Sequence, residues 1–159
     1  MALIYNRLDI KLESGAISNL PLPNSIYGKS ENDFIADSFV VSMKAGVVVS
    51  LDTTTKGIRP AGKANDVAIG FLVNDLAGFA NQSINGLVAG SAAVLVGSGN
   101  QFVTDNVVDS DITAGAPLYV ADDTGLLTKT QGTNITNPVA VAISGNSATN
   151  KAILVHTLI

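Results

Sequence analysis

One segment of this chain occurs twice, and the repeat restricts the folds that the chain can adopt. Residues 45–73 and 114–144 each begin with Ala-Gly, continue into a short apolar run and reach an Asp/Thr-rich turn closed by glycine. Each copy then passes through a short polar stretch and a loop to a strong apolar run. This order predicts three strands per copy, the first two joined by a hairpin turn. Two copies are too few for an extended stack, so the repeat predicts a compact β-barrel or sandwich of two similar halves.

The rest of the chain from Phe39 onward also indicates an all-β fold. A third, partial copy of the turn and first strand lies at 88–100. Ser30 to Asp37 is the one place where a single turn of helix is expected. Gly57 and Gly125 close turns that are expected to need a positive φ. Short apolar runs bounded by Gly, Asn, Asp and Thr predict strands at FVVSM, VVVSL, VAIGFLV, AAVLV, APLYVA, PVAVAI and AILVHTLI.

Strands that are apolar on both faces are expected to be buried on both sides. The run VAIGFLV, which begins at Val67, is the clearest case. Burial of both faces requires two covering layers, and we expect one of them to be another subunit.

The first part of the chain differs from the rest. Residues 1–38 are predicted to form an extended N-terminal arm, and residues 39–159 the β-barrel domain that contains the repeat. Pro21 and Pro23 are expected to prevent regular ladder pairing and to favour polyproline-like backbone. The arm either lies on a neighbouring molecule or forms a strand and loop that close the chain's own core. On the first interpretation, the candidate capsid- or partner-binding residues are its large apolar side chains, Leu20, Leu22, Ile26 and Tyr27.

Composition limits the partners of the protein. Of the 159 residues, 47% are hydrophobic but only 5% aromatic, so the core is expected to consist of Val, Ile, Leu and Ala. Charged residues make up 14%, against about 25% in ordinary soluble domains. A surface so low in charge is rich in Ser, Thr and Asn or is partly buried against other chains. The net charge of −4 and the scattered basic residues argue against nucleic acid and anionic membranes as partners.

Two further features bear on location. No apolar run approaches the roughly 18 residues that a membrane helix needs. The N-terminal stretch MALIYNRLDIKLESG carries charges within its apolar pattern, so we do not expect it to act as a signal peptide.

No group of residues indicates catalysis or metal binding. The single histidine, His156, alternates with leucines in a predicted strand and is expected to be structural or to lie at an interface. The chain has no cysteine and no GxSxG motif, and its GSGN segment lacks the Lys-Ser/Thr of a phosphate-binding loop. We therefore expect no enzyme activity, no cofactor and no metal. Two groups of carboxylates fit turn chemistry better than a calcium loop: Asp105, Asp109 and Asp111, and Asp122 and Asp123.

Several of these segments together resemble tailed-bacteriophage head decoration (cement) proteins. The resemblance covers roughly residues 40–159 and leaves out the N-terminal arm. It is carried by KAGVVVSL from Lys44, DVAIGFLVND from Asp66, the later AGAPLYV and VAVAI runs, and the closing AILV.

The resemblance implies a structural virion protein that binds the outer surface of an assembled capsid and stabilises it. It also implies the major capsid protein as partner, a homo-oligomer, often a trimer, and capsid contact through the N-terminal arm. Such a protein is made in the host cytoplasm and ends on the outer surface of the virion. The alternatives are another phage surface or fibre module that binds host carbohydrate, and a small barrel enzyme. The absence of Trp, the three Tyr and the single His make these less favoured.

Overall fold

The computed structural model describes residues 7–23, 25, 31–77 and 91–159. Within these residues the chain forms eleven strands and two short helices. The helices are α1 (Glu31–Ala36) and α2 (Ser38–Ser42). The strands are β1 (Asp9–Lys11), β2 (Ala16–Pro21), β3 (Val48–Leu51), β4 (Ile58–Pro60), β5 (Gly70–Leu72), β6 (Ser91–Val96), β7 (Gln101–Thr104), β8 (Pro117–Val120), β9 (Leu127–Thr128), β10 (Ala140–Ala142) and β11 (Ile153–Thr157).

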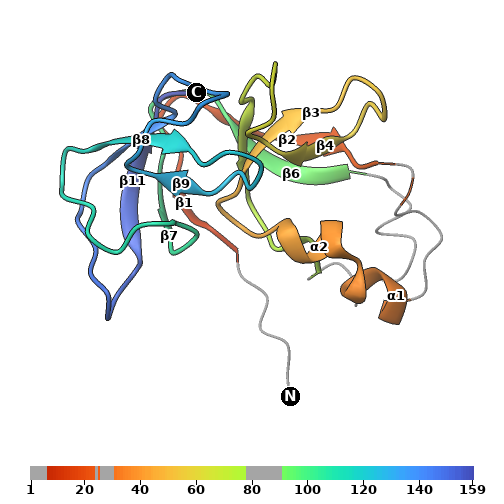
Figure 1. The fold of residues 1–159 in the computed structure, drawn as a ribbon, viewed down its shortest axis with the longest axis horizontal. Coiled ribbons are helices and arrows are strands. Elements are labelled where there is room, and N and C mark those ends of the chain that lie inside the picture. The colour runs from red at the N-terminus through yellow and green to blue at the C-terminus, as the bar shows by residue number, and fades with distance from the viewer. Residues whose placement is uncertain (1–6, 24, 26–30, 78–90) are drawn as a thin grey trace.

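The strands form two antiparallel sheets that do not close into a barrel. The five-stranded sheet has the order β2-β6-β5-β3-β4, and the six-stranded sheet has the order β1-β7-β11-β10-β8-β9. Figure 1 shows the six-stranded sheet on the left and the five-stranded sheet on the right. Without β1, the two orders are identical when β2 to β6 are matched with β7 to β11. The predicted all-β fold of two similar halves is confirmed, and each half supplies one sheet.

An inner core fills the space between the sheets. Val48, Phe71 and Leu95 enter it from the five-stranded sheet. The rings of Phe71 and Phe102 meet across the interface with centroids 4.9 Å apart, so aromatic contact joins the two halves. From the six-stranded sheet the inner core receives Phe102, Leu118, Val120, Ala140, Ala142, Ile153 and Val155.

A second core lies on the other face of the five-stranded sheet. Neighbours of the inner-core residues, such as Val49 and Leu72, point to this side because strand side chains alternate. They pack on Val40 and Met43, which are 1% and 0% exposed. The burial of both faces predicted for the run that begins at Val67 is therefore achieved within the chain from Gly70 to Val73, whereas Val67 itself is 72% exposed. The expectation of a second subunit over this face is wrong, since α2 covers it (Figure 1).

The helical segment is longer than expected. The turn of helix predicted at Ser30 to Asp37 is present as α1, but FVVSM, predicted as a strand, forms α2. Asp37 caps this helix, because its side chain accepts a hydrogen bond from the Phe39 N–H at 2.9 Å. The strand prediction relied on the β-branched pair Val40-Val41. The cap and the burial of Val40 and Met43 on one helical face outweigh that preference.

The N-terminal segment is mainly extended, as predicted, over residues 7–23, and the chain pairs this part within its own sheets. β1 pairs with β7, and β2 pairs with β6 from Ala16 to Pro21. The expectation that Pro21 would prevent ladder pairing is wrong for this residue. Pro21 ends an edge strand, where a missing N–H removes no ladder hydrogen bond when it faces away from the neighbour.

The β6–β7 turn is fastened to the β1–β2 connection by one buried side chain. Asn100 is 0% exposed. Its Oδ1 accepts hydrogen bonds from the Glu13 and Gly15 N–H groups, and its Nδ2 donates to the Gly97 carbonyl. The Asn100 N–H donates to the Thr157 hydroxyl, which ties the turn to β11. Asn100 therefore holds together the two connections, β1–β2 and β6–β7, that lead from one sheet to the other.

The two hairpin turns of the repeat use their glycines differently. Gly125 has a φ of +70°, as predicted, whereas in the first copy the positive φ belongs to Lys56 at +55°. The prediction that Gly57 needs a positive φ is therefore wrong. A Cβ at Gly57 would lie 2.5 Å from the Pro23 nitrogen, so close approach of the N-terminal segment requires glycine there.

Candidate functional site

The sequence-predicted contact residues fall in different environments. Leu20 lies in β2, half-buried against the second core, and Leu22 is 2% exposed within that core. Leu22 thus anchors the N-terminal segment to its own domain. Ile26 and Tyr27 lie outside the described residues. Their role as partner contacts stays a prediction.

A cleft of about 340 Å³ opens where β1 and β2 diverge into different sheets. Its apolar lining includes Leu12 and Ile17, which are 49% and 41% exposed. Arg7 and Asp9 also line it and supply charges of both signs. Large apolar side chains at this level of exposure are typical of surfaces that another chain covers. We call this feature the β1–β2 cleft; its lining is Arg7, Leu8, Asp9, Ile10, Leu12 and Ile17.

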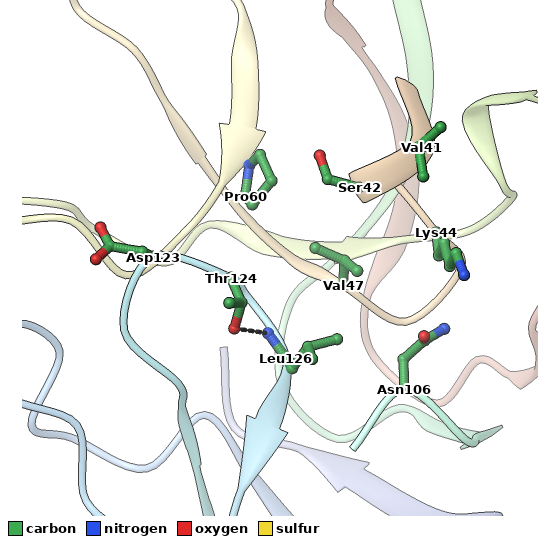
Figure 2. Close-up of a pocket in the computed structure, with 9 residues that line it drawn as sticks. All are labelled: Val41, Ser42, Lys44, Val47, Pro60, Asn106, Asp123, Thr124 and Leu126. Carbon is green, nitrogen blue, oxygen red and sulfur yellow. Dashed lines mark hydrogen bonds between the residues drawn. The ribbon is translucent and has the colours of Figure 1, made fainter. Parts of the chain in front are cut away.

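A second groove of about 350 Å³ lies between α2 and the hairpin turn of the second repeat copy. Figure 2 shows Val41, Ser42 and Lys44 on the helix side and Pro60 and Asp123 on the other. The lining is mainly apolar, and Val41 is 51% exposed. This groove lies between the two halves of the molecule and opens on its outside.

Two hydroxyl-bearing residues, Ser42 and Thr124, line the groove without the arrangement of a nucleophile and its base. Thr124 Oγ1 accepts a hydrogen bond from the Leu126 N–H at 3.4 Å and so belongs to the turn (Figure 2). The carboxylate of Asp123 points away from Ser42 (Figure 2). Nucleophilic catalysis needs these groups within hydrogen-bond reach, and the geometry of this groove suits contact rather than chemistry.

The aspartate groups of the second half hold loops. Asp109 accepts from the Thr128 hydroxyl and the Lys129 N–H, at 2.9 and 2.8 Å. Asp111 pairs with Lys129. In the described part of the chain, no group of three or more His, Cys, Asp or Glu side chains could hold a metal ion. These carboxylates act as turn and loop anchors, as the sequence predicts.

His156 lies on the outer face of the six-stranded sheet. It is half-buried in β11, opposite Val141 and Gln101, while its neighbours Ile153 and Val155 enter the inner core. The same outer face carries Val103 and Ile143, which are 43% and 40% exposed. Sequence analysis did not single out this face, because its apolar residues become adjacent only through strand pairing.

Asp122 holds the loop after β9. Its carboxylate accepts hydrogen bonds from the Thr133 hydroxyl and from the N–H groups of Thr133 and Asn134. These bonds favour the charged form, and the Thr133 hydroxyl has the largest part in lowering the pKa of Asp122 below its usual 3.8. The pKa values of three further carboxyls are lowered by hydrogen bonds to Lys11, the Thr54 N–H and Lys129: Glu13, Asp52 and Asp111.

Lowered carboxyl pKa values make folding sensitive to acid. A group with a lowered folded-state pKa contributes stability above its unfolded value and loses it as the pH falls through the folded value. We therefore expect a steady melting temperature from neutral pH to about 4.5, and a decline below 3.8. Asp122→Asn removes one of these groups and is expected to reduce the acid-induced decline in a pH series of thermal melts. An identical decline in the variant would contradict this role of Asp122.

The described residues contain no helix long and apolar enough to cross a membrane.

Comparison with known families identifies the chain. The model of the XM1 gp53 minor capsid protein family matches residues 15–157. The chain belongs to this family. It is therefore a phage capsid protein, a structural component of the virion, and it associates with the capsid. No curated protein matches the chain.

The matched region of this capsid protein has a structural meaning. Residues 15–157 run from the start of β2 to the end of β11, so they comprise both five-stranded halves and leave out β1. The predicted resemblance to phage head proteins is confirmed at the level of a capsid protein. The family match also extends through residues 15–38, which the resemblance had left out.

Proposed function

We propose that this capsid protein is a decoration (cement) protein, which binds the outer surface of the assembled shell and stabilises it. Membership of a minor capsid protein family carries the proposal. The two sheets pack on a common inner core and form a rigid body, as a protein that reinforces a capsid requires. The groove and the aspartate anchors offer contacts and support rather than reaction chemistry, so the proposed role includes no enzyme activity.

The proposed partner is the major capsid protein. The N-terminal segment is the proposed contact, through Leu20 and the predicted residues Ile26 and Tyr27, with Leu22 anchoring the segment from within the second core. Leu12 and Ile17 add exposed apolar surface beside this segment. A homotrimer is part of the proposal, because the low charge of the chain and its exposed apolar side chains suit contacts between copies.

The stabilising mechanism is mass action. A protein that binds the assembled lattice but not free subunits shifts the equilibrium towards the lattice. Many symmetry-related copies add avidity, so each single contact can be weak. Because the shell is repeated many times, modest affinity per site suffices.

Co-sedimentation with capsids that lack this protein tests the proposal. We expect saturable binding to assembled capsids, little binding to unassembled subunits, and a higher temperature of DNA release from filled capsids that carry it. Equal binding to free subunits, or an unchanged release temperature at saturation, would contradict the stabilising role.

A further inference from the structure

The two sides of the sandwich differ. On one side the halves are joined: the Val48 N–H donates to the Gly125 carbonyl, and the Gly62 carbonyl accepts from the Asp123 N–H and the Asn134 side chain. On the other side the sheets end in β1 and β2, which are consecutive in the chain but belong to different sheets. The Leu8 N–H, just before β1, donates to the Val73 carbonyl at 2.8 Å and links this end of β1 to the five-stranded sheet. The β1–β2 cleft opens between these two edge strands.

The register shows which backbone groups of β2 face outward. The Val73 N–H donates to the Ala93 carbonyl at 3.0 Å, so Ala93 points its backbone groups towards β5. Backbone groups alternate in direction along a strand, and the even-numbered residues of β6 therefore point towards β2. Their partners on β2 are Ala16, Ser18 and Leu20. The N–H and C=O groups of Ile17 and Asn19, and the carbonyl of Pro21, are left facing the free edge, the side of β2 on which no strand of the described residues pairs.

This free edge has little of the usual protection against pairing. Edge strands are normally blunted by charged residues, proline, bulges or short length, and of these β2 has only Pro21, its last residue, which removes one outward-facing N–H. β1 has such protection, since charges of alternating sign lie along it at Arg7, Asp9, Lys11 and Glu13. β2 is six residues long, pairs with β6 without a bulge, and has no charged residue from Ser14 to Pro23.

Side chains beside the edge are suited to an apolar partner. Ile17 pairs with Leu95, an inner-core residue, so Ile17 faces the space between the sheets and lines the β1–β2 cleft. A strand added next to β2 would direct alternate side chains to the same side, against Ile17 and Leu12. Backbone pairing and the exposed apolar side chains of the β1–β2 cleft are therefore available to one and the same partner strand.

We propose that the free edge of β2 accepts an extended, uncharged segment of the major capsid protein as an additional strand, with apolar side chains of that segment in the β1–β2 cleft. This inference rests on the proposed function and specifies its contact. Strand addition gains affinity from main-chain hydrogen bonds and specificity from alternate side chains.

The size of the contact favours a lattice subunit over a second free copy of this chain. Six residues of strand extend about 20 Å. One added strand over a single small cleft falls short of the roughly 1,200–2,000 Å² that stable interfaces bury. Such a contact is too small to hold a dimer in solution, but it is sufficient for a protein bound at many equivalent lattice positions.

Asn19→Pro tests the inference, because it removes an outward-facing N–H without removing a ladder bond to β6. Pro21, two residues further on, has the same backbone orientation as Asn19 and shows that β2 accepts proline at such a position. We expect a melting temperature close to that of the wild type and capsid binding weakened by at least about tenfold in a co-sedimentation titration. Asn19→Ala, which keeps the N–H, is the matched control and is expected to bind normally.

A second pair of variants tests the cleft. Ile17→Lys places a charge at the edge and is expected to weaken capsid binding, whereas Val67→Lys, at a 72% exposed valine in the connection between β4 and β5, is expected to bind normally. If Asn19→Pro binds capsids as tightly as the wild-type protein, strand addition is overturned and the proposed function stands. If the wild-type protein itself does not bind capsids, both are overturned. Solution dimers lost in Asn19→Pro, with unchanged capsid binding, would assign the edge to a second copy.

Discussion

Gly125→Ala is expected to lower the free energy of unfolding by about 3–5 kcal/mol, from left-handed strain and backbone crowding combined. Gly125 has a φ of +70°, and a Cβ there would lie 2.5 Å from the Val48 carbonyl oxygen and 2.8 Å from Val47 Cγ1. Gly125 also lies where the two halves are joined, because its carbonyl accepts a hydrogen bond from the Val48 N–H at 2.8 Å. Relief of the overlap requires one half to move away from the other.

Gly115→Ala is the matched control for this prediction. Gly115 has a φ of +85°, but a Cβ there would meet nothing within 4 Å. The variant should therefore show the conformational strain alone, about 1–2 kcal/mol. Urea denaturation of both variants separates the two contributions. Equal losses would show that the joint at Gly125 can relax and that close packing between the halves contributes little.

Asn100→Ala is expected to destabilise the protein by about 2–4 kcal/mol, because it removes a fully buried side chain that makes three hydrogen bonds to partly buried backbone groups. The Glu13 and Gly15 N–H groups lose their acceptor, and the Gly97 carbonyl loses a donor. All three lie at the corner where the N-terminal strands meet the β6–β7 turn. Equilibrium unfolding measures the loss, and hydrogen exchange should show faster exchange at Glu13 and Gly15.

Asn146→Ala provides the comparison at a similar but more accessible position. Asn146 Oδ1 accepts from the Ile112 N–H at 2.8 Å, and its Nδ2 donates to the Asp109 carbonyl. Because Asn146 is half-exposed, water can replace these bonds, and we expect a loss of only about 1 kcal/mol. A loss as large as that of Asn100→Ala would contradict the view that burial makes the corner asparagine special.

The repeat could be recognised from the sequence because its signals are local. An Ala-Gly pair, a β-branched run and a turn closed by Gly125 are determined by neighbouring residues, and they give the same three-strand unit in both halves. The sequence does not predict the α2 helix, because this helix depends on contacts with distant parts of the chain. The run at Phe39 has strand preference, and it becomes helical because Asp37 caps it and because a sheet face lies ready to receive Val40 and Met43.

The candidate site depended on information that the sequence does not contain locally. The large apolar residues of the N-terminal segment were visible, but the burial of Leu22 follows from a core assembled by α2 and the five-stranded sheet. Likewise, the absence of charge along β2 is visible in the sequence, whereas its position at a sheet edge results from pairing with β6, many residues away. Edges and clefts are properties of long-range pairing.

A reconstruction of capsids that lack this protein, before and after its addition in purified form, tests the central claim most directly. The account predicts new density at regularly repeated positions on the outer surface, with β2 the nearest strand to the shell. Density confined to the interior of the shell, or no new density at saturating protein, would contradict it.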